Sequence, residues 1–311
     1  MCGIVAGAGN NPRGLPVFSC PVCRHELEQA HGALACRRCA RRFPIIDGVA
    51  VLTAGEAEGH KLRQAVWFDE QTDDEFEITR PHGTPALYEW YYRNKFARSV
   101  STLSSWVGGS MALTVCGGSG MDAEFLARSG ATVICSDISL GAAGRATERA
   151  ARYGLAITPI VAEAERLPFG DQAVDFVFVH DGLHHLPDPL AGVREMARVS
   201  RCAVSISEPA RAAVTAVAVA LGLAREFEDA GNRVARLTPA EVVAVLREDG
   251  FVITRAQRYA MYHRHEPGRV IAALSAGPTF AATKVAVRAF NALAGCIGNK
   301  LTVQAVRIGA P

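Results

Sequence analysis

Short apolar runs alternate with amphipathic stretches through the second two thirds of the chain. Apolar runs of strand length lie at 112–116, 132–136, 157–162, 174–179 and 203–207, and helical patterns lie between them at 121–129, 140–153 and 190–199. Because strands that alternate with helices pack as a parallel sheet covered on both faces, this order predicts an α/β fold with a doubly wound sheet.

The C-terminal third has a different pattern. A helix is predicted over 238–249, where Thr238 stands as N-cap and Glu241 follows three residues later as in a capping box. A strand at 251–259, a mainly helical apolar stretch at 270–294 and a last strand at 301–308 complete the chain. A further apolar run covers 212–224.

The first hundred residues are less regular. A β-like run at 43–52 contains the turn signal Asp47-Gly48, and residues 53–80 are polar and acidic. An aromatic helix that contains Tyr88, Tyr91 and Phe96 is expected to begin near Pro85. We expect an N-terminal tail at 1–17, a small module at 18–53, an acidic linker and helical cap at 54–100, and the main domain at 101–311.

Composition excludes several classes of protein. The 311 residues are 49% hydrophobic, which permits a large core, and the net charge of +2 argues against a chain held to nucleic acid by its overall field. No secretory signal is apparent, and the apolar stretch 270–298 is interrupted by Lys284 and Arg288. We therefore expect a cytoplasmic protein without a transmembrane segment.

Four of the nine cysteines form two Cys-x2-Cys pairs, Cys20 with Cys23 and Cys36 with Cys39. Two such pairs supply the four thiolates of a tetrahedral, closed Zn²⁺ site, and the metal would stabilise a module too small to fold alone. Four arginines crowd the second pair, namely Arg37, Arg38, Arg41 and Arg42. They suit phosphate binding, but a solvated face or pairing with the acidic linker is the preferred interpretation.

The stretch from Cys20 to Leu52 resembles the zinc-ribbon activator subunit of certain RNA and protein methyltransferases. The resemblance rests on the CPxC pair, the later CxxC pair, the Phe43-Pro44-Ile45 run and the Asp47-Gly48-Val49 turn. It implies a structural zinc site, because no ligand position is left open for water.

A glycine-rich turn follows the first strand of the main domain. Gly117, Gly118 and Gly120 precede a helix, so the backbone can approach a ligand at the helix N-terminus, and Asp137 ends the next strand. A carboxylate at that position accepts hydrogen bonds from the ribose hydroxyls of an adenosine cofactor, and these elements alone would first suggest NAD.

Later segments favour another cofactor. Glu163 precedes the Leu167-Pro168-Phe169 run, a Val-Asp-Phe-Val strand follows, and Leu183-His184-His185-Leu186-Pro187-Asp188-Pro189 comes after it. Over about 111–207 this succession resembles class I S-adenosylmethionine-dependent methyltransferases, especially those of quinone biosynthesis. The resemblance implies a seven-stranded Rossmann-like sheet and S-adenosyl-L-methionine as cofactor.

The resemblance also implies roles for single residues. Gly117, Gly118 and Gly120 would line the methionine part of the cofactor, Asp137 would bind the ribose, Ile138 would contact the adenine, Glu163 and Ala164 would lie near the adenine amino group, and His180 would begin the loop that faces the sulfonium. Two positions depart from the family pattern: Thr114 replaces an acidic residue and Cys116 replaces the first glycine. Asp122 is a candidate substitute for the missing carboxylate.

His184 is the candidate general base, with His185 and Glu208 as further residues at the same rim.

Three functions remain open: methylation of a small or lipid-like acceptor such as a quinone or secondary metabolite, methylation of an rRNA or tRNA base, and a non-catalytic role in cofactor binding or as a scaffold. A small-molecule substrate is preferred and RNA is the alternative partner. Residues 88–96 and 270–294 are expected to close an apolar acceptor pocket. Neither the acceptor atom nor the oligomeric state follows from the sequence.

Overall fold

The computed structural model describes residues 16–55, 59–70, 74–212, 234–261 and 265–310, together with positions 215, 219, 227 and 231. Nearly all of the predicted tail 1–17 and of the apolar run 212–224 lies outside the described residues.

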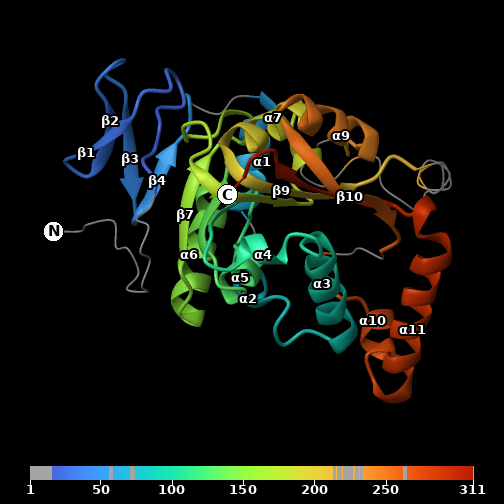
Figure 1. The fold of residues 1–311 in the computed structure, drawn as a ribbon. Helices are drawn as coiled ribbons and strands as arrows, with labels where there is room; N and C mark the ends of the chain where they lie inside the picture. Colours follow the sequence, from blue (N-terminus) through green and yellow to red (C-terminus); the bar gives the residue numbers. More distant parts are fainter. Residues whose placement is uncertain are drawn as a thin grey trace.

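One sheet of eleven strands runs through the molecule in the order β1-β2-β3-β4-β7-β6-β5-β8-β9-β11-β10 (Figure 1). The strands are β1 (Leu27–Ala30), β2 (Ala33–Cys36), β3 (Arg42–Ile46), β4 (Val49–Leu52), β5 (Met111–Val115), β6 (Thr132–Asp137), β7 (Ile157–Ala162), β8 (Val174–His180), β9 (Ser200–Pro209), β10 (Phe251–Tyr259) and β11 (Lys300–Arg307).

The last seven of these strands form the predicted α/β core. Strands β5 to β9 pair in parallel, and β11 pairs antiparallel with both β9 and β10. The doubly wound order and the antiparallel ending predicted from the sequence are therefore confirmed.

The N-terminal module extends the predicted seven-stranded sheet to eleven strands. Strand β4 pairs in parallel with β7, from Ala50 opposite Ile160 to Leu52 opposite Ala162. The free edge of β7 offers unpaired backbone groups, and β4 satisfies them. The N-terminal module, residues 18–53, is hereafter called the ribbon.

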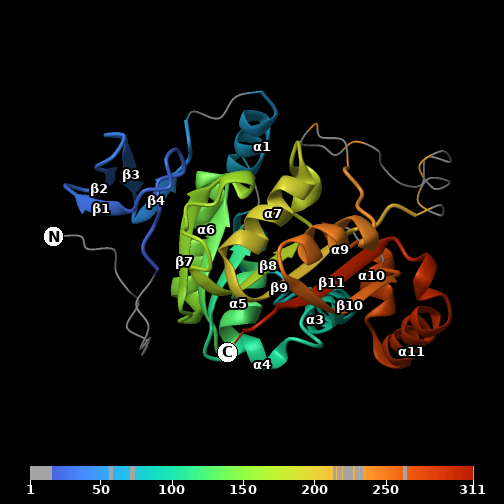
Figure 2. The ribbon, with the colours of Figure 1, turned by 45° about the horizontal axis from the view of Figure 1, so that its top comes forward.

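Helices cover both faces of the core, as Figures 1 and 2 show. The helices are α1 (Gly59–Asp69), α2 (Asp74–Thr79), α3 (Ala86–Ser99), α4 (Ser104–Val107), α5 (Met121–Arg128), α6 (Leu140–Tyr153), α7 (Pro189–Val199), α9 (Pro239–Glu248), α10 (Arg269–Leu274) and α11 (Gly277–Ala294), with short 3-10 turns at Ala164–Arg166, Leu183–His185 and Gly295–Ile297. Helices α7 and α9 lie on one face, and α3 to α6 lie on the other.

Strand β8 shows why the sheet is buried on both sides. Phe176 and Phe178 belong to the core on the α3–α5 face, whereas Val177 and Val179 belong to the core on the α7 face. Successive side chains of a strand point to opposite faces, so a continuous apolar run fits a strand that is covered twice.

The C-terminal third confirms one helix and corrects another. Thr238 and Glu241 form the predicted capping box, in which the Thr238 N–H donates to Glu241 Oε2 at 2.7 Å. The single helix predicted at 270–294 is two helices, α10 and α11, because the chain turns before Gly277 and Pro278 begins a new helix.

Among the described residues, one stretch, Gly277–Ile297, is long and apolar enough to cross a membrane by length and composition. From the sequence we expect no transmembrane segment here, because Lys284 and Arg288 interrupt the apolar stretch. Only 6% of its most apolar window is buried inside the protein.

Candidate functional site

The carboxyl ends of the parallel strands carry the candidate site. Strands β5, β6, β7 and β8 end at the same edge of the sheet, and the glycine turn, Asp137, Glu163 and His180 lie at or directly after these ends. Ligands of doubly wound sheets bind at this edge. A pocket lined by Gln172 and Arg201 lies instead near the amino ends of β8 and β9.

The turn after β5 has the backbone shape that glycine permits. Gly118 and Gly120 have φ values of +52° and +82°. A Cβ at Gly118 would meet nothing within 4 Å, so this turn leaves space beside its backbone. Cys116, in the position of the family's first glycine, also has a positive φ of +52°.

Gly117 is needed for a different reason. A Cβ on Gly117 would lie 2.5 Å from Cys135 Sγ of β6 and 2.8 Å from Thr114 Oγ1 of β5. Its small size therefore serves packing between the turn and the sheet.

Asp137 connects the glycine turn to the end of β6. Its Oδ2 accepts the Gly118 N–H at 2.8 Å, and its Oδ1 accepts the Ser139 N–H at 3.0 Å. Burial raises the pKa of this carboxyl above its usual range. Each carboxylate oxygen has a second lone pair, so the group can still accept two hydroxyl hydrogen bonds from a diol.

Helix α1 lies across the ends of β7 and β6. Lys61 Nζ lies 2.5 Å from Glu163 Oε2 and 2.8 Å from Glu165 Oε2. At the other end of α1, Asp69 Oδ1 accepts the Ser139 hydroxyl at 2.7 Å and the Gly141 N–H at 2.8 Å. The predicted acidic linker therefore contains a helix that covers the candidate site.

The two apolar residues expected beside the adenine lie at this covered edge. Ala164 is buried in the short turn after β7, and Ile138 is half-buried directly after Asp137. Glu163, expected near the adenine amino group, is bound to Lys61 and also accepts the Ala54 N–H at 3.3 Å.

His180 ends β8 and pairs with Asp122 at the start of α5. The distance between His180 Nδ1 and Asp122 Oδ1 is 2.9 Å. Burial raises the pKa of Asp122 to about 7. The other ring nitrogen, His180 Nε2, is buried without a hydrogen-bond partner among the described residues, and it lies 3.9 Å from Asp181 Oδ2.

Beside His180 lies a buried ion cluster that was not predicted from the sequence. Asp181 Oδ1 lies 2.6 Å from Lys300 Nζ, and Asp181 Oδ2 contacts Lys95 Nζ. Burial lowers the pKa of Lys95 to about 8, against the opposing charge of Asp181. Lys95 lies on the same helical face as Tyr88 and Tyr92. A lysine at helical spacing from two apolar aromatic residues was the feature of the sequence that could have indicated a buried charge.

His184, the predicted base, is held by Glu208. Its Nδ1 lies 2.9 Å from Glu208 Oε2, while Glu208 Oε1 accepts the N–H groups of Gly182 and Leu183 at 2.8 Å each. Glu208 thereby fixes both the loop after β8 and the orientation of the His184 ring.

The aromatic residues of the predicted cap lie mainly in the core. Tyr88, Tyr92 and Phe96 are buried, and the Phe96 ring stacks on Phe125 of α5 with centroids 5.0 Å apart. Tyr91 is half-buried and contacts Trp90. Helix α3 packs against α10 and α11, so the two segments expected to cover the acceptor do lie together.

The four predicted metal ligands also come together. The Sγ atoms of Cys20, Cys23, Cys36 and Cys39 all lie within 4.8 Å of one another, with Cys20 and Cys39 at 3.6 Å and Cys23 and Cys36 at 3.4 Å. Tetrahedral zinc with Zn–S bonds of about 2.3 Å separates its sulfurs by about 3.8 Å. The thiolates therefore have the spacing of a closed four-sulfur site.

The ribbon contacts the Leu167-Pro168-Phe169 segment. The Ser19 N–H donates to the Pro168 carbonyl at 2.9 Å, and the rings of Phe18 and Phe169 lie 5.6 Å apart. Arg24 donates to the Leu167 carbonyl at 2.9 Å and pairs with Glu195. This part of the methyltransferase-like pattern thus forms the interface with the ribbon.

Comparison with known proteins agrees with both parts. Residues 113–202 match the family described as methyltransferase domain, and residues 12–48 match the Trm112p-like protein family. The demethylmenaquinone methyltransferase of Corynebacterium urealyticum is 38% identical over 93 residues, which are 30% of this chain and 38% of that protein. The enzyme of the same name from Mycobacterium sp. (strain KMS) is 32% identical over 112 residues, 35% of this chain and 45% of that protein. The chain thus spans less than half the length of these relatives.

Two solved structures share the fold. The (4+2)-cyclase SpnF has a TM-score of 0.54 at 18% identity, over 81% of this chain and 97% of that one. The magnesium protoporphyrin IX methyltransferase of Synechocystis PCC 6803, solved with bound SAH, has a TM-score of 0.52 at 19% identity, over 80% of this chain and all of that one.

Proposed function

We propose that this chain, which carries a methyltransferase domain and a Trm112p-like zinc-ribbon domain, is an S-adenosylmethionine-dependent methyltransferase for a small, hydrophobic or lipid-like acceptor. The observation that carries the proposal is the Asp137 carboxylate, which is hydrogen-bonded to the Gly118 N–H of the glycine turn. A diol-binding carboxylate and an open turn at one sheet edge form the site that an adenosine cofactor needs.

The chain's own residues would bind the cofactor and exclude water. The cofactor supplies a methyl group on a sulfonium, which is electrophilic. Asp137 accepts the ribose hydroxyls, the turn at Gly118 and Gly120 lets the backbone approach the amino acid end, and Ile138 and Ala164 provide apolar contact for the adenine. Helix α1, fixed by Lys61 and Asp69, covers this edge. Positioning and exclusion of water supply most of the acceleration in such a transfer.

The acceptor would enter beside the end of β8. Methyl transfer to a phenol or an activated carbon requires removal of a proton, and two histidines at this end are candidates. His184 remains the predicted base, with Glu208 as its positioning residue. The His180–Asp122 pair is the second candidate, because His180 Nε2 is buried with no hydrogen-bond partner among the residues described.

The ribbon would hold one structural Zn²⁺ on Cys20, Cys23, Cys36 and Cys39. Four thiolates leave no coordination position for water or substrate. The site would act by stabilising the ribbon and, through β4, the edge of the main sheet.

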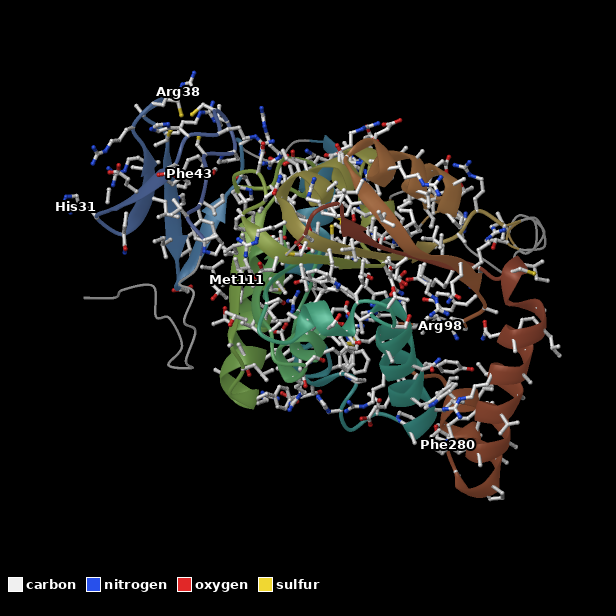
Figure 3. The ribbon with its side chains drawn as sticks, in the orientation of Figure 1. His31, Arg38, Phe43, Arg98, Met111 and Phe280 are labelled. Atoms are coloured by element: carbon white, nitrogen blue, oxygen red, sulfur yellow. The ribbon has the colours of Figure 1, made fainter. Side chains whose placement is uncertain are left out.

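RNA is the weaker candidate acceptor because the ribbon arginines are largely engaged within the protein. Arg37 pairs with Glu28, Arg41 donates to the Ala54 carbonyl, and Arg42 donates to the Ala30 carbonyl. Arg38 lies at the outer tip of the ribbon (Figure 3). A single free arginine is a small footprint for phosphate recognition.

Isothermal calorimetry with S-adenosylmethionine and S-adenosylhomocysteine tests the cofactor site. We expect both to bind, and Asp137→Ala to weaken binding by about 10- to 150-fold, because loss of a charged acceptor costs about 1.5–3 kcal/mol. Asp137→Asn, which keeps an acceptor for the Gly118 N–H, distinguishes loss of ribose contacts from a collapsed turn. Asp171→Ala, at an exposed carboxylate, is the matched control. Equal affinity in the wild type and both Asp137 variants would place the cofactor elsewhere.

A further inference from the structure

The α10–α11 hairpin, residues 269–297, is firmly attached to the main domain. Ile271 of α10 is buried, and Ser275 Oγ accepts the Leu87 N–H of α3 at 3.0 Å. Asn291 of α11 accepts the Ala260 N–H at 2.7 Å and donates to the Ala260 carbonyl at 3.0 Å. The guanidinium of Arg288 lies 5.7 Å from the centre of the Trp90 ring. The orientation of α11 is therefore fixed by contacts near both of its ends.

This attachment leaves apolar side chains of α11 facing outward. No residue of α11 is buried, and the exposed fractions are 65% for Val285, 50% for Phe290, 87% for Leu293 and 55% for Ile297 in the following turn. The half-buried positions of the helix include the polar Thr283, Lys284 and Asn291. A surface helix normally turns its polar face to water, and α11 departs from that rule.

The charges of the hairpin have one sign. Arg269, Lys284 and Arg288 are its only charged residues, and the sequence contains no Asp or Glu after Glu266. Lys284 Nζ lies 4.1 Å from the centre of the Phe280 ring, so its aliphatic stem runs along the helix surface. Figure 3 shows Phe280 on this hairpin, at the opposite end of the molecule from the ribbon.

We propose that the outer face of α11 docks on the surface of an anionic lipid bilayer. Exposed Phe, Leu, Ile and Val side chains insert at the boundary between headgroups and acyl chains. The positive charge of the hairpin, which Arg269, Lys284 and Arg288 supply, attracts the anionic headgroups over the Debye length of about 10 Å. Because α11 is tied to Trp90 and Ala260, it lies along the bilayer surface and does not cross it. A nucleic acid would find few hydrogen-bond donors on this face, and it would leave the apolar side chains in water.

The docked orientation brings α3 toward the bilayer, because the hairpin packs on α3. Helix α3 also carries Lys95 of the buried ion cluster next to His180. Docking therefore places the acceptor end of the site, and not the ribbon, close to the lipid.

Vesicle co-sedimentation of the full chain tests the proposal without cofactor or methyl transfer, so its outcome is independent of the proposed function. The probes are vesicles of phosphatidylcholine alone and vesicles that contain phosphatidylglycerol. We expect binding to the anionic vesicles, a decrease at high salt, and a loss of about tenfold or more in the double variant Phe290→Ser, Leu293→Ser. Val252→Ser removes an equally exposed apolar side chain from β10 and should leave binding unchanged.

Thermal melting establishes that the double variant is folded before its binding is read. Lys284→Glu should weaken binding to the anionic vesicles and leave the melting curve unchanged.

Absence of vesicle binding by the wild type, or equal binding by the wild type and the double variant, would overturn the proposal. A concentration-dependent dimer that the double variant loses, without vesicle binding, would assign the face to a second copy of the chain. Salt-sensitive retention of RNA in place of vesicles would likewise overturn it.

Discussion

The two edges of the seven-stranded core are extended in opposite ways. At β7 the ribbon adds strand β4 by backbone pairing and buries Phe18, Leu27, Phe43 and Leu52 in the same core as the sheet. Beyond the other edge strand, β10, the α10–α11 hairpin is attached by a few side chains and leaves Leu293 and Val285 in solvent. The ribbon completes the fold, whereas the hairpin presents a surface.

This difference follows from how each segment satisfies its backbone. The edge strand β7 offers backbone N–H and C=O groups, and the ribbon satisfies them by adding β4 as a further strand. Helix α11 satisfies its backbone internally and needs no such partner. Its apolar residues are therefore available for an external partner at little cost to the fold.

The largest effect is expected from breaking the cysteine cluster. Cys36→Ser removes one of four thiolates, and we expect it to lower the free energy of unfolding by more than about 3 kcal/mol, because the ribbon depends on the metal. Since β4 belongs to the main sheet, the loss should reach β7 and not remain within the ribbon. Chemical denaturation with zinc analysis measures it. Cys296→Ser, an exposed lone cysteine near the hairpin's end, is the control. If the protein were equally stable with and without zinc, the ribbon would not depend on the metal and its role in completing the sheet would be contradicted.

A matched pair of phenylalanines tests the burial difference at the two edges. Phe18→Ala deletes a ring that packs on Phe169, and it should cost about 3 kcal/mol or more. Phe290→Ala deletes a half-exposed ring of α11 and should change stability by less than about 0.5 kcal/mol. Urea denaturation of both variants gives the comparison. Similar losses in the two would show that the hairpin is part of the core.

A smaller effect concerns the pH dependence of stability. Burial raises the pKa of Asp122 from 3.8 to about 7 in the folded protein, so the folded state binds this proton more tightly than the unfolded state. The resulting stability is present at low pH and is lost as the pH rises from about 4 through about 7. In Asp122→Asn, the difference in unfolding free energy between low and high pH should be smaller by about 1–2 kcal/mol. This is less than the full pKa shift implies, because the charges of His180, Lys95, Asp181, Arg80 and Arg149 titrate or act together with this carboxyl. Unfolding free energies of both proteins at pH 5 and pH 8 measure it, and parallel pH profiles would exclude Asp122 as the source.

The fold of the core could be predicted from the sequence because its signals are local. Strand β8 contains the continuous apolar run Phe176–Val179, the helix after it has Asp188 as N-cap, and Thr238 with Glu241 forms a capping box. The two Cys-x2-Cys pairs are also a local signal, and they predicted that the four cysteines lie close together. The break between α10 and α11 also had a local signal, the Gly277-Pro278 pair, which the prediction of one helix overlooked.

Contacts between distant segments could not be predicted in this way. The pairing of β4 with β7 joins two short apolar strands that carry no mark of their partner. Lys61 lies in a polar segment without helical periodicity, so nothing near it indicates Glu163. The ion cluster joins Lys95, Asp181 and Lys300 from three elements, and burial of charge depends on a tertiary environment that a single sequence does not display.

Methyl transfer to a hydrophobic acceptor can be measured by incorporation of label from S-adenosylmethionine that carries a radioactive methyl group. Wild-type protein and Asp137→Ala are incubated with a cell extract that is then separated into lipid and RNA fractions. We expect label in the lipid fraction with the wild type and a strong reduction with Asp137→Ala. Label confined to RNA, or no transfer to either fraction by a protein that binds the cofactor, would contradict it.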